Sequence, residues 1–177
     1  MTKANSTSSA LENLLNILRS GKVLGSGAKG FIKGDRRAAC FMDIPFASLK
    51  HVCTTSNDTR YEPFGIVVTK QTAYRNGARP VLYLSNDECD TLSIPKTELW
   101  RVVRFEVDAV SKKWKSFLHE REWRCPDDFK VPKRAVSVLV NSVKDVALLQ
   151  AALAKGKFAC QPQSILPLEV VCQGLVY

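Results

Sequence analysis

The stretch FLHEREWRCP, Phe117 to Pro126, combines a dense set of charges with the pattern of a β-strand. Successive side chains of an extended chain project to opposite faces. The alternation therefore predicts that Glu120, Glu122 and Arg124 share one face, while Trp123 anchors the other face in the core. Two interpretations stay open here. Either the glutamates face a pocket and act on a ligand, or they form a structural ladder with neighbouring arginines.

Strands are predicted on both sides of this stretch. Short apolar runs rich in β-branched and aromatic residues, bounded by turn residues, are typical of buried strands. Such runs occupy residues 38–45, 64–70, 79–85, 99–108 and 135–141, and the last segment, 166–177, predicts one or two more.

Helices are predicted where apolar residues recur every three or four positions. Residues 9–21 carry a leucine stripe between a capping Ser9 and a terminating Gly21. Residues 142–156 show the same pattern of cap, apolar stripe and terminating glycine, between Ser142 and Gly156. Short helices fit residues 46–52 and 71–78. A further helix is expected over residues 107–117, because Val107, Val110, Trp114 and Phe117 follow the same spacing, with Lys112, Lys113 and Lys115 outside.

These elements predict an α+β fold in which helices pack on a mixed or antiparallel sheet. The chain has 177 residues, and we expect one domain over residues 9–177 after a loose polar tail of residues 1–8. No apolar run approaches the ~20 residues that cross a bilayer, and the first residues lack a secretion signal. We therefore expect a cytoplasmic protein with no membrane partner.

The cysteine pattern predicts reduced structural thiols. None of the six cysteines has CxxC spacing, and only two histidines are present to assist them. Such a set does not resemble a zinc module, so no metal is expected. The formal net charge of +9 favours contact with nucleic acid or another anion.

Basic residues follow a glycine-rich loop, Gly25 to Gly34. Glycines let a backbone approach phosphate, and arginine binds phosphate through two parallel hydrogen bonds, so Arg36 and Arg37 are candidate phosphate ligands. His51 is a candidate acid, base or ribose contact, and Tyr61 could stack on a planar ring. Ordinary packing is the alternative for both.

The paired carboxylates carry the most specific chemistry. On one strand, Glu120 and Glu122 would have Cα atoms roughly 6.5 Å apart. Two carboxylates so close raise the pKa of at least one of them, and such a pair can stabilise an oxocarbenium ion in glycosyl chemistry.

The segments LENLLNILRSGKVLGSG, RRAACFMDIPFASLKH, YEPFGIVVTKQTAYRNGARPVLYL and EREWR resemble the AbiGi-type abortive-infection proteins over about residues 11–126. More distantly, the order of helix, basic strand and late glutamate is similar to ADP-ribosyltransferases, including the DNA-modifying DarT group. In arginine-specific members of that superfamily, the second glutamate of an E-x-E pair is catalytic.

The resemblance implies an ADP-ribosyltransferase-like domain that takes NAD as substrate in phage defence or a toxin–antitoxin system. It implies that Glu122 stabilises the oxocarbenium ion, that Glu120 steers a nucleic-acid or protein acceptor, and that Arg36 or Arg37 holds the pyrophosphate. His51 and Tyr61 are the further candidate NAD contacts. A cognate toxin or antitoxin is a possible partner.

Two alternatives remain. The first is a non-catalytic, antitoxin-like module that uses its basic charge to bind nucleic acid or a toxin. The second is a metal-dependent nuclease built from Glu106, Asp108 and the glutamate pair.

Overall fold

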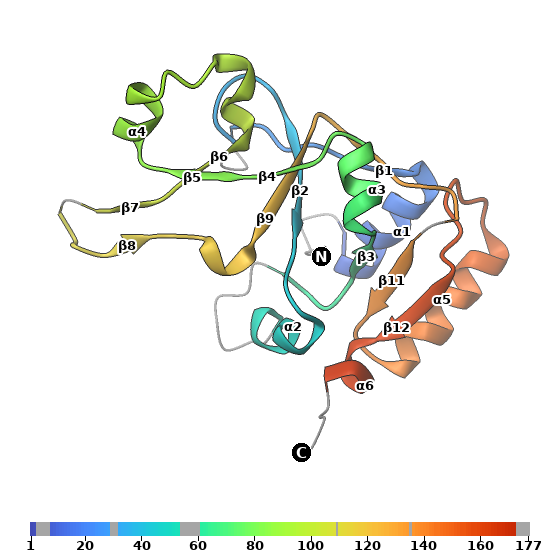
Figure 1. Ribbon diagram of the computed structural model, residues 1–177. Helices are drawn as coiled ribbons and strands as arrows, with labels where there is room; N and C mark the ends of the chain where they lie inside the picture. Colours follow the sequence, from blue (N-terminus) through green and yellow to red (C-terminus); the bar gives the residue numbers. More distant parts are fainter. Residues whose placement is uncertain (3–7, 29–31, 54–60, 109, 135, 173–177) are drawn as a thin grey trace. The chain divides into compact units, whose positions relative to one another are not determined.

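The computed structural model describes residues 1–2, 8–28, 32–53, 61–108, 110–134 and 136–172 (Figure 1). Its helices and short strands form a mixed α and β fold with both antiparallel and parallel strand pairs. The chain divides into two compact units. The first contains Met1–Lys22, Pro45–Thr69 and Lys130–Tyr177, and the second contains Val23–Ile44 and Lys70–Phe129.

The first unit is built around strand β11 (Ser137–Val140). It pairs antiparallel with β3 (Gly65–Val67) and parallel with β12 (Ser164–Pro167). Val138, Leu139 and Val140 are all buried. Because successive side chains point to opposite faces, three consecutive buried residues mean that both faces of this strand are covered.

The two long helices of the first unit confirm the predicted caps. Helix α1 (Ala10–Ser20) begins with a capping box between Ser9 and Glu12 and ends at Gly21, whose φ of 65° is left-handed. Helix α5 (Val143–Lys155) begins with a capping box on Ser142, stops at Gly156 and packs on β11 and β12. Each box satisfies amides that the first helical turn leaves unpaired.

Smaller features of the first unit depart from the sequence prediction. Residues 168–172, expected as strand, form helix α6 (Leu168–Cys172), which packs against α2 (Phe46–Val52). Residues 173–177 lie outside the described part of the chain. Within the expected tail, the amide of Thr2 donates to the carbonyl of Phe64 at 2.6 Å, and its hydroxyl donates to the carbonyl of Ala10 at 2.9 Å.

The second unit is built around β9 (Glu122–Pro126). This strand lies between β2 (Ala38–Met42) and β4 (Arg79–Pro80), and both pairings are antiparallel. The strand was expected over residues 120–126 but begins at Glu122, because the left-handed φ of 45° at Arg121 interrupts the extended backbone. Glu120 belongs instead to the 3₁₀ turn η3 (Leu118–Glu120).

All the remaining elements of the second unit except β10 precede β9 in the chain. Strands β5 (Leu82–Leu84) and β6 (Val102–Arg104) pair in parallel, as Figure 1 shows. The segment between them holds α4 (Asn86–Thr91) and the 3₁₀ helix η2 (Lys96–Arg101). Helix α3 (Lys70–Arg75) lies before β4, and β1 (Lys22–Val23) pairs with β10 (Phe129–Lys130).

The predicted helix over residues 107–117 is wrong. Strands β7 (Glu106–Val107) and β8 (Trp114–Lys115) form an antiparallel hairpin in which Val107 lies opposite Trp114. The apolar residues that would have formed a buried helical stripe are exposed: Val107 is 46%, Val110 93% and Trp114 65% accessible. None of the described helices is long and apolar enough to span a bilayer.

Candidate active site

The side chain of Glu122 is bound by that of Arg124, two residues farther along β9. Arg124 Nε donates to Glu122 Oε1 at 2.8 Å, and Nη2 donates to Oε2 at 3.2 Å. Both residues are buried, with 8% and 4% of their surface accessible. This fork is the strongest geometry that an arginine and a carboxylate can make, and it fixes the glutamate in orientation.

Arg124 is held in turn by the main chain of another segment. Its Nη1 donates to the carbonyl of Trp100 at 2.9 Å and to that of Val102 at 3.1 Å. These two carbonyls lie at the end of η2 and the start of β6. A buried arginine whose donors are shared between a carboxylate and two carbonyls is a rigid support. It therefore positions Glu122.

Tyr83, on β5, supports Glu122 from its main-chain side. The Tyr83 hydroxyl accepts a hydrogen bond from the Glu122 amide at 3.1 Å and donates to the carbonyl of Phe117 at 3.4 Å. Burial raises the pKa of this phenol, and the carboxylates of Glu122 and Glu120 raise it further. The hydroxyl therefore stays neutral and able to donate at physiological pH.

Glu120 joins this cluster from the turn before the strand. It is buried, with 8% of its surface accessible, and its charge influences the Tyr83 hydroxyl. Its carbonyl accepts from the Asp43 amide at 3.3 Å. The predicted pairing of two glutamates on one strand face is therefore wrong in detail: both carboxylates lie near Tyr83, but only Glu122 projects from the strand.

A thiol and three charged groups complete the surroundings. Cys40 on β2 lies opposite Arg124. The residue as a whole is exposed, but partial desolvation of its thiol, followed by the charge of Glu122, raises its pKa to about 12. Asp43 Oδ2 binds Lys70 Nζ at 2.8 Å and lies 3.6 Å from Arg121 Nη2. This carboxylate thus draws two basic side chains to the segment that carries Glu120.

Arg36 and Arg37, the predicted phosphate ligands, lie at the other end of the β2–β9 pair. Arg36 Nη2 binds Asp127 Oδ2 at 2.9 Å, and Arg37 Nη2 lies 3.3 Å from Asp128 Oδ1. The five residues of β2, Ala38 to Met42, lead from this end to the one that pairs with Glu122, a span of about 13 Å over four residue steps. The structure therefore does not place these arginines beside the glutamates.

Gly25, the first glycine of the predicted phosphate loop, has a packing role. A Cβ at this position would lie 2.3 Å from the carbonyl oxygen of Asp127, and the Gly25 amide donates to Asp128 Oδ1 at 3.1 Å. Close approach of two backbones requires glycine here.

His51 and Tyr61 belong to the first unit, whereas the glutamate cluster belongs to the second. His51 lies exposed on α2, and Tyr61 is partly buried just before the chain enters β3.

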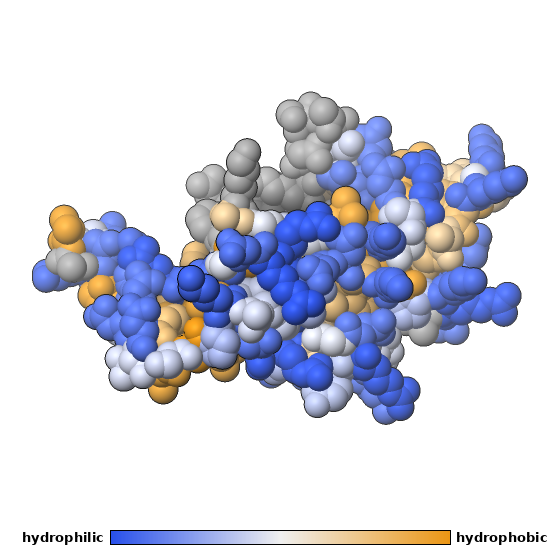
Figure 2. Space-filling view, turned by 90° about the horizontal axis from the view of Figure 1, so that it is seen from above, coloured by the Kyte–Doolittle hydropathy of each residue, from blue (hydrophilic) through white to orange (hydrophobic). Residues whose placement is uncertain are grey.

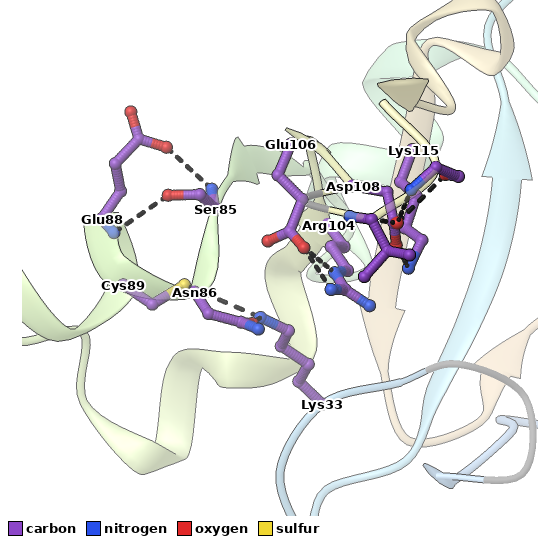
Figure 3. A network of polar contacts seen from close by, with 11 residues as sticks. Lys33, Ser85, Asn86, Glu88, Cys89, Arg104, Glu106, Asp108 and Lys115 are labelled. Carbon is purple, nitrogen blue, oxygen red and sulfur yellow. Dashed lines mark hydrogen bonds and ion pairs between the residues drawn. The ribbon is translucent and has the colours of Figure 1, made fainter. Parts of the chain in front are cut away.

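The residues of the nuclease alternative are engaged by basic partners. Arg104 Nε donates to Glu106 Oε1 at 2.7 Å, and Lys115 Nζ lies 2.5 Å from Asp108 Oδ2, as Figure 3 shows. In the described part of the chain, no group of three His, Cys, Asp or Glu residues is arranged to hold a metal ion.

No family model, curated protein or solved structure matches this chain. The site therefore rests on its own geometry. Sequence reasoning identified Glu120 and Glu122 but assigned Tyr83 no role and gave Arg124 only that of a structural partner. The signal for Arg124 was its i+2 spacing from Glu122 on a strand, whereas Tyr83 lies 39 residues from Glu122 and only folding brings the two together.

Proposed function

We propose that the cluster around Glu122 is an ADP-ribosyltransferase-like centre that cleaves NAD and transfers ADP-ribose to a nucleic-acid or protein acceptor. The observation that supports this most is the buried Glu122 carboxylate, fixed by Arg124 and Tyr83, with a second buried carboxylate on Glu120 close by. The resemblance of EREWR to the E-x-E segment of ADP-ribosyltransferases supports the same reading. Its biological setting would be phage defence or a toxin–antitoxin system.

The chemistry assigns a separate task to each carboxylate. The bond between C1′ of the ribose and the nicotinamide nitrogen breaks, and its electron pair leaves with nicotinamide. Glu122 stabilises the positive charge that develops on the ribose, as a fixed carboxylate does in glycosyl transfer. The acceptor then attacks C1′, and Glu120 takes the proton that the acceptor loses. Arg124 and Tyr83 are positioning residues.

The test is titration calorimetry of NAD into the full chain, together with chromatographic measurement of nicotinamide release. We expect micromolar binding and slow release for the wild type. Glu122→Gln should reduce release at least ~100-fold, the scale of losing one electrostatic group in a transition state. A variant that turns over NAD like the wild type would contradict the proposal.

The matched control is Glu106→Gln. Glu106 also pairs with an arginine two residues away in the same unit, but this pair is more accessible: 43% of the Arg104 side chain is exposed, against 4% for Arg124. It should release nicotinamide like the wild type. Because Glu122→Gln weakens a buried ion pair, Glu122→Asp is measured too, and rates are expressed per folded protein from circular dichroism.

The second candidate function is a non-catalytic, basic binding module. It is favoured by one observation: both carboxylate oxygens of Glu122 already accept from Arg124. A wild-type chain that neither binds NAD nor releases nicotinamide would make this pair structural and leave the binding module as the function.

A further inference from the structure

The β7–β8 hairpin presents an exposed surface, and none of its described residues belongs to the cluster around Glu122. In its two paired strands, Glu106 lies opposite Lys115 and Val107 lies opposite Trp114. Val110 is 93% accessible, the highest value among the exposed large hydrophobic residues. Figure 2 shows the region of the hairpin, at the left edge, as orange atoms among blue ones.

Asp108 fixes the loop of the hairpin. Its Oδ1 accepts from the amides of Val110 at 3.2 Å and Ser111 at 2.9 Å, and from the Ser111 hydroxyl at 3.0 Å. Its Oδ2 binds Lys115, and Figure 3 shows this ion pair. The bond to Lys115 is the largest cause that lowers the pKa of Asp108, so the loop keeps this anchor at neutral pH.

Trp114 is held as a flat platform. Its ring stacks on that of Phe105, with centroids 5.1 Å apart and planes 25° apart. One ring face is therefore covered, while 65% of the residue remains accessible. An aromatic ring fixed in this way can stack on a nucleobase without losing much side-chain freedom.

Lysines flank the platform. Lys112 and Lys113 are exposed, and no ion pair joins either of them to another residue in the described ranges. The two acidic residues of the hairpin are already neutralised, Glu106 by Arg104 and Asp108 by Lys115. The hairpin therefore presents unpaired positive charge beside an aromatic ring.

We infer that the β7–β8 hairpin binds single-stranded nucleic acid, with a base stacked on Trp114 and phosphates held by Lys112 and Lys113. The net charge of +9 attracts the same polyanion over a longer range. A lipid surface fits less well, because the exposed apolar residues that the structure describes in the hairpin, Val107, Val110 and Trp114, are few and lie beside exposed lysines. Stacking plus phosphate neutralisation is how sequence-tolerant single-strand binding works.

This inference names an acceptor class for the proposed transferase, and to that extent it rests on the proposed function. Binding itself is measured without NAD, so the two can fail separately. Glu122→Gln should bind nucleic acid like the wild type. Trp114→Ala should still bind NAD.

The experiment is fluorescence anisotropy of the full chain with labelled 20-nucleotide single strands of mixed sequence, one of DNA and one of RNA, at several salt concentrations. We expect Trp114→Ala to weaken binding about tenfold and Trp114→Phe to retain most of it. Replacing Lys112 and Lys113 with serine should reduce the salt slope by about 1.4, the share of two phosphates. The DNA and RNA arms show which strand binds more tightly.

The charge-matched control replaces Lys155 and Lys157, exposed residues in and just after α5, with serine. It should bind nearly as well as the wild type. Wild-type chain that binds neither strand at 50 mM salt, or Trp114→Ala that binds as well as wild type, would overturn the inference. An equal loss of nucleic-acid affinity in the Lys112/Lys113 variant and in the Lys155/Lys157 variant would also overturn it. Binding to phosphatidylglycerol vesicles without binding to either strand would overturn it too, and would assign the hairpin to a lipid surface.

Discussion

At position 124, a guanidinium is almost completely buried, and its donors are divided between a carboxylate and two main-chain carbonyls. Taking such a charge out of water is expensive unless every donor finds a partner. Glu122 supplies the compensating negative charge, while Trp100 and Val102 supply the remaining acceptors. The same contacts that make this pair tolerable in the interior also hold the Glu122 carboxylate still.

The sequence predicted part of this arrangement. Alternation along a strand places Glu122 and Arg124 on one face, and their ion pair confirms it. Position 121 could not be foreseen, because a left-handed arginine breaks the alternation before Glu122. Tyr83 could not be foreseen either, since its bond to the Glu122 amide depends on how distant strands pack. Arg36 and Arg37 lie at the end of the β2–β9 pair that is opposite to Glu122. The register of these two strands places them there, and no local sequence pattern specifies that register.

Cys40 provides a test of the electrostatics near the glutamate. Its raised pKa of about 12 keeps the thiol neutral, so the reactive thiolate is about 0.1% of the population at pH 9, against roughly half or more for an ordinary cysteine. We expect its alkylation by iodoacetamide, followed by peptide mass spectrometry, to rise about tenfold per pH unit between pH 8 and 10. An ordinary cysteine levels off in this range.

Glu122→Gln is the paired variant for this measurement. Removing the negative charge lowers the pKa of Cys40, so alkylation at pH 9 should become faster. Desolvation of the thiol, the larger cause of the raised pKa, keeps it slower than in a peptide. If the alkylation rate of Cys40 in the wild type already levels off near pH 9, its thiol does not lie in the desolvated, negatively charged surroundings of Glu122.

Among the elements, the β7–β8 hairpin shows where periodicity misleads. Val107, Val110, Trp114 and Phe117 match helical spacing, but Asp108 caps the turn between them and Lys112 takes a left-handed φ of 54°. Because Val107, Val110 and Trp114 are exposed, no buried helical face forms here. Helices α1 and α5 were predicted correctly because caps, stripe and terminating glycine all agreed.

Two glycines of one loop give a matched pair for stability. An added Cβ on Gly25 would collide with the Asp127 backbone, whereas one on Gly27 would meet its nearest atom only at 3.9 Å, on the Arg37 side chain. We expect Gly25→Ala to reduce the free energy of unfolding by about 1–3 kcal/mol or more. Gly27→Ala should change it by less than about 0.5 kcal/mol. Urea unfolding measures both, and equal effects would contradict the assigned close approach.

At the scale of the whole molecule, each unit is assembled from separated pieces of chain. The chain passes between the units at residues 22–23, 44–45, 69–70 and 129–130. Strands β2 and β9 of the second unit are linked through a segment of the first, residues 45–69. The sequence predicted the kinds of element but not this division, because it depends on contacts between distant segments.

This interleaving predicts that the chain unfolds in one transition. Leu14, fully buried in α1 of the first unit, is the probe: Leu14→Ala should cost about 2–5 kcal/mol. All three tryptophans, Trp100, Trp114 and Trp123, belong to the second unit. We expect tryptophan fluorescence and far-ultraviolet circular dichroism to show the same lowered urea midpoint. A fluorescence midpoint that stays at the wild-type value would mean that the units unfold separately.

Two hydrogen bonds at the end of helix α1 can form only after residues far along the chain have been synthesised. The carbonyls of Leu18 and Arg19 accept from the amides of Cys160 and Ala159, so these bonds join residues about 140 positions apart. At roughly 5–20 residues per second, a ribosome needs about 7–30 s to reach them. Throughout that interval, the nascent helix carries a leucine face with no native partner from the end of the chain. A chaperone that recognises amphipathic segments would find its target in the helix Ala10–Ser20 during that interval.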